Sequence, residues 1–220
     1  AAGAGLPMMR SMLLKPMAKP VLFVLALLPF AWLVFGALTQ NLGPNPAEAL
    51  IRSTGDWTLR SLCLVLAVTP LRVMTGTAAL ARFRRMLGLF VFFYAFVHLL
   101  CYSWLDMEFV VADIARDIAK RPFILVGFAA IVLLTALAAT SFNRVVKAMG
   151  ARRWQRLHRT VYLVAALALL HFFWMRAGKN NFGEVAVYAA IIAVLLGWRL
   201  VHAWRRRRRP TTVPAPRSAA

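Results

Sequence analysis

Acidic residues are scarce in this chain. Seven Asp and Glu stand against 27 Lys and Arg in 220 residues, which gives a formal net charge of +20. A basic balance of this kind is typical of nucleic-acid-binding proteins. Here, however, the basic residues separate long apolar stretches, and 61% of the chain is hydrophobic, whereas soluble domains are usually ~45–50% apolar. The composition therefore indicates a membrane protein and argues against a nucleic-acid partner.

Cysteine is also scarce, and the usual cysteine motifs are missing. The two cysteines, Cys63 and Cys101, both fall inside apolar runs, so a disulfide framework is not expected. No CxxCH sequence occurs, so covalent c-type haem attachment is not indicated. We also expect no removable signal peptide, because the first apolar run lacks a small-residue cleavage site.

Six apolar runs are long enough to cross a bilayer, which takes about 20 residues each. The predicted fold is therefore all-α, a polytopic bundle of six transmembrane helices. We divide the chain into an N-terminal segment at 1–20, a six-helix domain at 21–204 and a basic, disordered tail at 205–220. The outer loop 106–121 is expected to form an interfacial helix. The predicted spans are 21–39, 57–75, 86–105, 122–141, 159–176 and 185–204.

The distribution of charge predicts the orientation. Most of the lysines and arginines fall in segments 1–20, 72–85, 144–159 and 199–217, which share one side of the membrane if the spans alternate. All seven acids fall on the other side. Because basic segments stay inside, both termini are predicted to be cytoplasmic. In a bacterium the membrane is then the inner membrane.

Two histidines lie at membrane depth, where a polar side chain is costly and indicates function. His98 lies thirteen residues beyond Arg85, and His171 lies thirteen beyond His158. At 1.5 Å per residue each is about 20 Å along its helix. The two spans run in the same direction, so both imidazoles reach one level in the outer half of the membrane. The alternative is an interhelical hydrogen bond from each ring. The matched depth favours a pair of axial ligands to one b-type haem iron.

The candidate cofactor-binding residues on the inner side each have two possible roles. His158 is a ligand of a possible second haem or an interfacial residue that binds a phosphate or propionate. In an ideal helix it does not share a face with His171. The matching positions on the third span hold Arg84 and Arg85, which either bind a flavin phosphate or haem propionates or only keep this loop inside. His202, beside the arginine run, is interpreted as a snorkelling interface residue.

The sequence resembles a known family over residues 50–175. The matching segments are GDWTLR at 55–60, VTPLR at 68–72, RRMLGLFVFFYAFVHLLCY at 84–102, DIAKRPFILVGFAA at 117–130 and TSFNRVVKAMGARRWQRLHRTVYLVAALALLHFFW at 140–174. These segments are similar to MsrQ, formerly YedZ, the haem-binding membrane subunits of bacterial periplasmic methionine sulfoxide reductases. More widely, they resemble the membrane domains of ferric reductases and NADPH oxidases.

The resemblance implies a redox function. Ferric reductases and NADPH oxidases carry two histidines on each of two helices and hold two haems, whereas this chain matches three of them, at His98, His171 and His158. The MsrQ resemblance implies b-type haem, bound FMN, electrons from the quinone pool, and delivery to a periplasmic molybdenum-containing MsrP-like subunit. Substrate reduction is then expected on the partner, and whether the chain alone is an enzyme stays open.

Two other functions remain open from the sequence. One is a stand-alone transmembrane ferric or quinone reductase, which would reduce its acceptor without a partner. The other is a non-redox transporter that uses the histidines as proton relays. A purified protein without colour would favour the transporter.

Overall fold

The computed structural model describes residues 13–177, 180 and 182–208, and this part of the chain contains helices and no strand. Six helical segments are long and apolar enough to cross a membrane. The prediction of an all-α, six-span membrane protein is therefore confirmed. The helices are α2 (Ala18–Leu38), α3 (Pro46–Thr75), η1 (Ala78–Phe83), α4 (Arg84–Cys101), η2 (Tyr102–Asp106), α5 (Val111–Lys120), α6 (Pro122–Ala139), α7 (Asn143–Met149), α8 (Ala151–His158), α9 (Val161–Ala177) and α10 (Gly183–Arg207).

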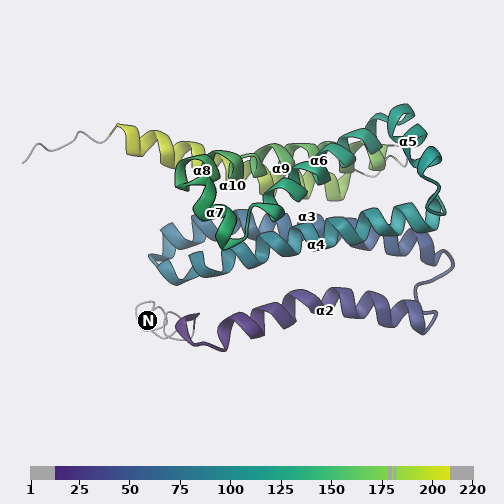
Figure 1. Cartoon of the computed structure of the whole chain (residues 1–220), viewed down its shortest axis with the longest axis horizontal. Helices are drawn as coiled ribbons and strands as arrows, with labels where there is room; N and C mark the ends of the chain where they lie inside the picture. The colour runs from purple at the N-terminus through teal and green to yellow at the C-terminus, as the bar shows by residue number, and fades with distance from the viewer. Residues whose placement is uncertain (1–12, 178–179, 181, 209–220) are drawn as a thin grey trace, which may run out of the picture.

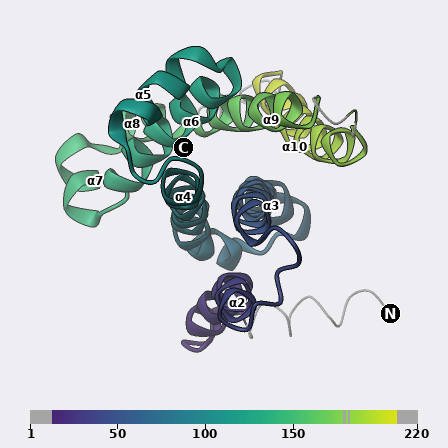
Figure 2. The same ribbon diagram turned by 90° about the vertical axis from the view of Figure 1, so that its right-hand side faces the viewer.

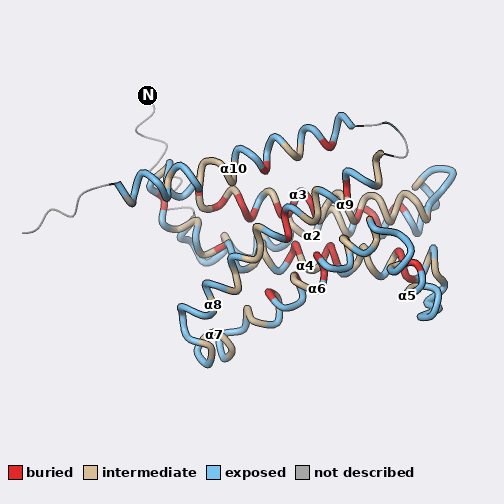
Figure 3. Tube along the Cα trace, turned by 90° about the horizontal axis from the view of Figure 1, so that it is seen from above, coloured by how far each residue is buried: buried red, intermediate tan, exposed pale blue. Residues whose placement is uncertain are grey.

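The helices are arranged around two antiparallel pairs. Helix α3 packs along α4, and α6 packs along α9. Viewed from one end, α6, α9 and α10 form an arc on one side of the α3–α4 pair, and α2 lies on the opposite side (Figure 2). The buried residues gather where the two pairs meet, whereas α2 and α10 are mostly exposed (Figure 3). Their exposed side chains, such as Trp32 and Leu200, are apolar, as a lipid-facing helix requires.

Helix α3 is longer than the predicted span 57–75 because it begins with a polar turn. Pro46 stands at the first helical position, where its missing N–H removes no hydrogen bond. The Asn45 side chain caps the helix by accepting the Glu48 N–H at 3.1 Å. Hydropathy does not detect this start, because charged residues occupy the first turns. The extension matters because it supplies one wall of the site described below.

The predicted fifth span, 159–176, agrees with α9 to within two residues, and a break separates it from the preceding helix. Helix α8 ends at His158, two residues in a turn follow, and α9 begins at Val161. The short helices lie at opposite ends of the bundle. Helices α7 and α8 are at the left of Figure 1, and α5 is at the far right. Helix α5 is the helix predicted within 106–121.

The C-terminal boundary differs slightly from the predicted one. Helix α10 continues through Arg207, so the first residues of the predicted tail 205–220 are helical. Residues 209–220 lie outside the described part, as do residues 1–12 of the predicted N-terminal segment. Pro29 and Pro70 lie inside α2 and α3, and both helices continue through them.

Candidate functional site

The structure brings His98 and His171 together. His98 lies in the last turn of α4 and His171 in the second half of α9, and these helices run in the same direction. The two ring centres are 6.2 Å apart and the ring planes are inclined by 77°. Both rings line a cavity of about 520 Å³ between α3, α4, α6 and α9. The matched depth expected from the sequence is therefore present; the role as ligands stays a prediction.

Each of these two rings is held by a hydrogen bond of its Nδ1 atom. His98 Nδ1 lies 2.9 Å from the Ile51 carbonyl oxygen on α3, and His171 Nδ1 lies 2.7 Å from the Phe123 carbonyl oxygen on α6. A carbonyl oxygen only accepts, so each Nδ1 carries the proton and donates it. In the neutral imidazole the Nε2 atom is then unprotonated and able to bind a metal. A backbone carbonyl that orients a histidine through its other nitrogen is the usual support of a metal ligand.

Two glycines make room for the rings. A Cβ atom placed on Gly127 of α6 would lie 2.8 Å from His171 Nδ1, and one on Gly55 of α3 would lie 3.2 Å from His98 Cε1. The first distance is shorter than any tolerable contact, and the second requires the ring to move. Both histidines thus lie against the backbone of a neighbouring helix.

The spacing of the two rings fits a metal held between them. An imidazole nitrogen binds a metal at about 2.0 Å, and the ring centre lies about 1 Å farther away, so two rings on opposite sides of one metal have centres about 6 Å apart. The described residues contain no group of three or more His, Cys, Asp or Glu that would complete a purely protein-based metal site. Haem needs only two axial protein ligands, because its macrocycle supplies the others. The donor set therefore fits haem.

Polar residues close the mouth of this cavity. Tyr102 donates a hydrogen bond of 2.6 Å to Asp117 on α5, and the other carboxylate oxygen of Asp117 accepts from Arg121 Nε at 2.8 Å. Tyr102 and Asp117 are both buried. Across the mouth, Glu48 and Arg52 form an ion pair within α3. Helix α5 thus closes one end of the cavity, and its buried Asp117 holds it there by accepting the hydrogen bond from Tyr102.

A second cavity of about 320 Å³ lies at the other end of the same helices, and His158 lines it. Trp154 stacks on the His158 ring with centres 4.0 Å apart. His158 Nε2 lies 3.2 Å from the Thr140 hydroxyl, whose own hydrogen goes to the Ala136 carbonyl at 2.7 Å. Nε2 of His158 is therefore the donor and carries a proton. The structure thus places His158 in this cavity between Trp154 and Thr140, and its role as the ligand of a second haem or as a residue that binds a phosphate or propionate stays a prediction.

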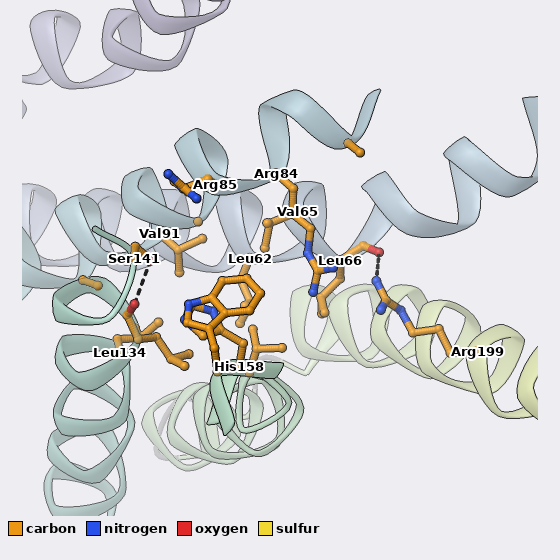
Figure 4. Close-up of a pocket in the computed structure, with 16 residues that line it drawn as sticks. Leu62, Val65, Leu66, Arg84, Arg85, Val91, Leu134, Ser141, His158 and Arg199 are labelled. Carbon is orange, nitrogen blue, oxygen red and sulfur yellow. Dashed lines mark hydrogen bonds between the residues drawn. The ribbon is translucent and has the colours of Figure 1, made fainter. Parts of the chain in front are cut away.

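The arginines predicted for the inner side separate into two roles. Arg84 and Arg85 both line this cavity, and the Arg84 side chain extends toward Arg199 (Figure 4). Arg85 donates to the Asn143 side chain. A third arginine, Arg199 of α10, also reaches this cavity and donates to the Leu66 carbonyl and to the Tyr162 hydroxyl. His202 lines neither cavity and stacks on Trp198, with ring centres 4.9 Å apart.

Sequence reasoning missed several residues of both cavities. Gly55 and Gly127 carry no chemical signature, and their role depends on which helix faces each histidine. Arg199 lies in the last predicted span, where its sequence context indicates only an inner charge. Its contact with α3 bridges 133 positions of sequence. Neither local spacing nor hydropathy identifies these three residues as part of a site.

Comparisons with known proteins give a consistent family. The family described as "Ferric reductase like transmembrane component" matches residues 54–169. The protein-methionine-sulfoxide reductase heme-binding subunit MsrQ of Polaromonas naphthalenivorans is 72% identical over 197 residues, which is 90% of each chain. The subunit of the same name from Herminiimonas arsenicoxydans is 52% identical, over 86% of this chain and 87% of its own.

A relative with a different name is also similar. The magnetosome protein MamZ of Magnetospirillum gryphiswaldense is 44% identical over 193 residues, which is 85% of this chain and 29% of that protein. No solved structure matches the chain.

Proposed function

The chain belongs to the ferric reductase-like transmembrane family and, within it, to the MsrQ family, and on this premise we propose that it is a haem-binding electron-transfer subunit of a methionine sulfoxide reductase system. Its own residues hold and orient the cofactor, and methionine sulfoxide is reduced on a partner. The observation that carries the proposal is the His98–His171 pair, with ring centres 6.2 Å apart and both Nδ1 atoms held by backbone carbonyls.

In this proposal His98 and His171 are the axial ligands of one b-type haem. The Ile51 and Phe123 carbonyls fix the tautomer and the direction of each ring before the cofactor binds. The walls of the cavity are mostly apolar, and the polar side chains of its lining, among them Arg52 and Arg121, gather at the end that α5 closes. When bound, haem supplies a one-electron carrier.

The finer parts of the proposal concern direction and partners. We place the chain in the bacterial inner membrane with both termini in the cytoplasm, because the acids lie at the end of the bundle that holds His98 and His171 and most arginines lie at the other end. Electrons come from the quinone pool, through FMN, and leave for a periplasmic MsrP-like molybdenum subunit. The names of the MsrQ relatives support a role in a methionine sulfoxide reductase system. The quinone, FMN and MsrP parts of the proposal rest on the resemblance to the MsrQ family.

Absorption spectroscopy of histidine variants tests the ligands. His98→Ala and His171→Ala should each remove most of the Soret absorbance of the purified protein while the chain still inserts in the membrane. His202→Ala is the matched control, because it removes a histidine that lines neither cavity. Normal haem content in both single variants would rule out the assignment.

The second candidate function is a stand-alone ferric or quinone reductase, which the match to the ferric reductase-like family favours. The two functions separate in one assay. Purified protein with reduced haem is mixed with ferric chelate alone, or with MsrP-like subunit and methionine sulfoxide. Rapid reoxidation by ferric chelate alone would support the second function.

A further inference from the structure

One layer of apolar side chains separates the two cavities. The larger cavity, of about 520 Å³, is the outer one, and the smaller, of about 320 Å³, is the inner one. Leu62 of α3 and Leu134 of α6 line both cavities. Val91 of α4 lines only the inner cavity, and Val164 of α9 lines only the outer one. Each of the four helices that meet there thus contributes one residue to the layer.

The two valines lie at one level because of their spacing from the histidines. Val91 precedes His98 by seven positions, and Val164 precedes His171 by seven positions. Seven residues make about two helical turns, or about 10 Å, and return the side chain to nearly the same face. Because the two histidine rings lie side by side, the two valines lie side by side as well, about two turns nearer the inner end.

The two leucines reach the same level from the opposite direction. Gly55 of α3 and Gly127 of α6 lie against the rings of the two histidines. Leu62 follows Gly55 by seven positions, and Leu134 follows Gly127 by seven positions. Helices α3 and α6 run from the outer end to the inner end, so both leucines lie about 10 Å below the histidines, level with the valines.

The layer is closely packed and dry in character. Leu62 is 0% exposed, Val91 and Val164 are each 1% exposed, and Leu134 is 5% exposed. All four belong to one cluster of buried apolar residues. Aliphatic side chains offer water no hydrogen-bond partner, so a water molecule or a hydrated proton inside the layer would be costly.

Polar regions lie on both sides of the layer. The outer cavity is lined by charged residues that are exposed at the α5 end of the bundle, such as Asp106 and Arg121. The inner cavity is lined by Arg84 and Arg85, which are exposed at the arginine-rich end. Each region therefore reaches one aqueous side of the membrane, and the layer lies between them.

We propose that Leu62, Val91, Leu134 and Val164 form a barrier that stops water and protons while electrons cross it by tunnelling. A proton needs a chain of water molecules or of titratable groups, and these four side chains provide neither. An electron needs no such chain, and the barrier is a single layer of side chains. The electron part of this inference rests on the proposed function, whereas the proton part does not.

Proton flux into proteoliposomes tests the barrier. The purified full chain is reconstituted with a pH-sensitive dye inside, valinomycin and potassium balance the charge, and the external medium is acidified. Wild-type protein should add no flux to that of protein-free liposomes. Leu62→Ser/Leu134→Ser should raise the flux roughly tenfold or more, because the hydroxyls give water hydrogen-bond partners inside the layer. Leu64→Ser/Leu125→Ser, which changes two exposed leucines of the same helices, is the matched control and should keep the wild-type flux.

A second variant keeps the test decisive if the serine variant does not fold. Val91→Thr/Val164→Thr adds two hydroxyls to the same layer with almost no change of side-chain shape, and it should also raise the flux. Monodisperse elution and helix content by circular dichroism report folding, and no electron donor is present, so a failure of haem ligation leaves the comparison valid. Folded barrier variants that leak no faster than the control, or a wild type that already adds proton flux, would overturn the inference.

Discussion

At the scale of single residues, the site formed by His98 and His171 depends on two glycines as well as on the histidines, because the glycines leave room for the rings. His98 and His171 could be selected from the sequence because polar groups at membrane depth are rare. Gly55 and Gly127 could not, because only the packed structure shows that a ring occupies the space of their missing Cβ atoms. The same holds for Arg199, whose partners lie on other helices.

Gly127→Ala should disturb the site without removing a ligand. The added methyl group would lie 2.8 Å from His171 Nδ1, so the ring must turn or shift away from the Phe123 carbonyl. We expect reduced haem content and an altered low-spin electron paramagnetic resonance spectrum. Gly197→Ala is the control, since its Cβ would meet nothing within 4 Å. Unchanged spectra in both variants would show that His171 is not held as described.

His158→Ala should preserve the outer haem. His158 lies in the other cavity, and its Nε2 is bonded to Thr140. We expect the low-spin absorbance to persist, with slower electron input. The measurement is the reduced-minus-oxidised spectrum beside that of His171→Ala. Loss of the same signal in both variants would make His158 a ligand and would contradict its placement.

At the scale of helices, hydropathy predicted the number of spans and missed their polar ends. The charged first turns of α3 lie outside the predicted span 57–75, yet Ile51 and Gly55 in those turns contact His98. The break between α8 and α9 could not be predicted either, because the run through His158 reads as one continuous helix. Helix ends depend on capping and tertiary contacts, which weigh little in a hydropathy average.

Helix α5 provides a prediction at this scale. Tyr102→Phe removes the hydrogen bond to buried Asp117 and should destabilise the docking of α5 by about 1–3 kcal/mol. Faster amide exchange in α5 and a lower unfolding temperature would report the effect. Asp113→Asn, on the exposed side of the same helix, should change stability by less than about 1 kcal/mol. Equal stability of wild type and Tyr102→Phe would mean that the bond does not fasten α5.

At the scale of the whole molecule, the two cavities lie at opposite ends of shared helices. Arg84 and His98 are the first and fifteenth residues of α4, so their levels differ by about 20 Å. The charges of the sequence indicated this arrangement, because all seven acids belong to one end of the bundle and most of the basic residues to the other. The cavities could not be predicted from the sequence, because they form only where α3, α4, α6 and α9 pack together.

The proposed direction of electron flow is testable in membranes. With a quinol donor, the haem should become reduced, and an added MsrP-like subunit with methionine sulfoxide should reoxidise it from the periplasmic side. Inside-out vesicles, which expose the arginine-rich end to the added subunit, are the control and should show no reoxidation. Reoxidation only by a cytoplasmic acceptor would reverse the direction.

The separation of the cavities along the helices also has an electrical consequence. An electron that enters at the arginine-rich end and leaves beside α5 crosses part of the membrane dielectric, where one elementary charge is worth about 2.3 kcal/mol per 100 mV. With that end in the cytoplasm, the negative interior drives the electron outward. Transfer between the two ends is therefore electrogenic, and an ionophore that collapses the membrane potential should slow it even where the redox potentials of donor and acceptor are unchanged.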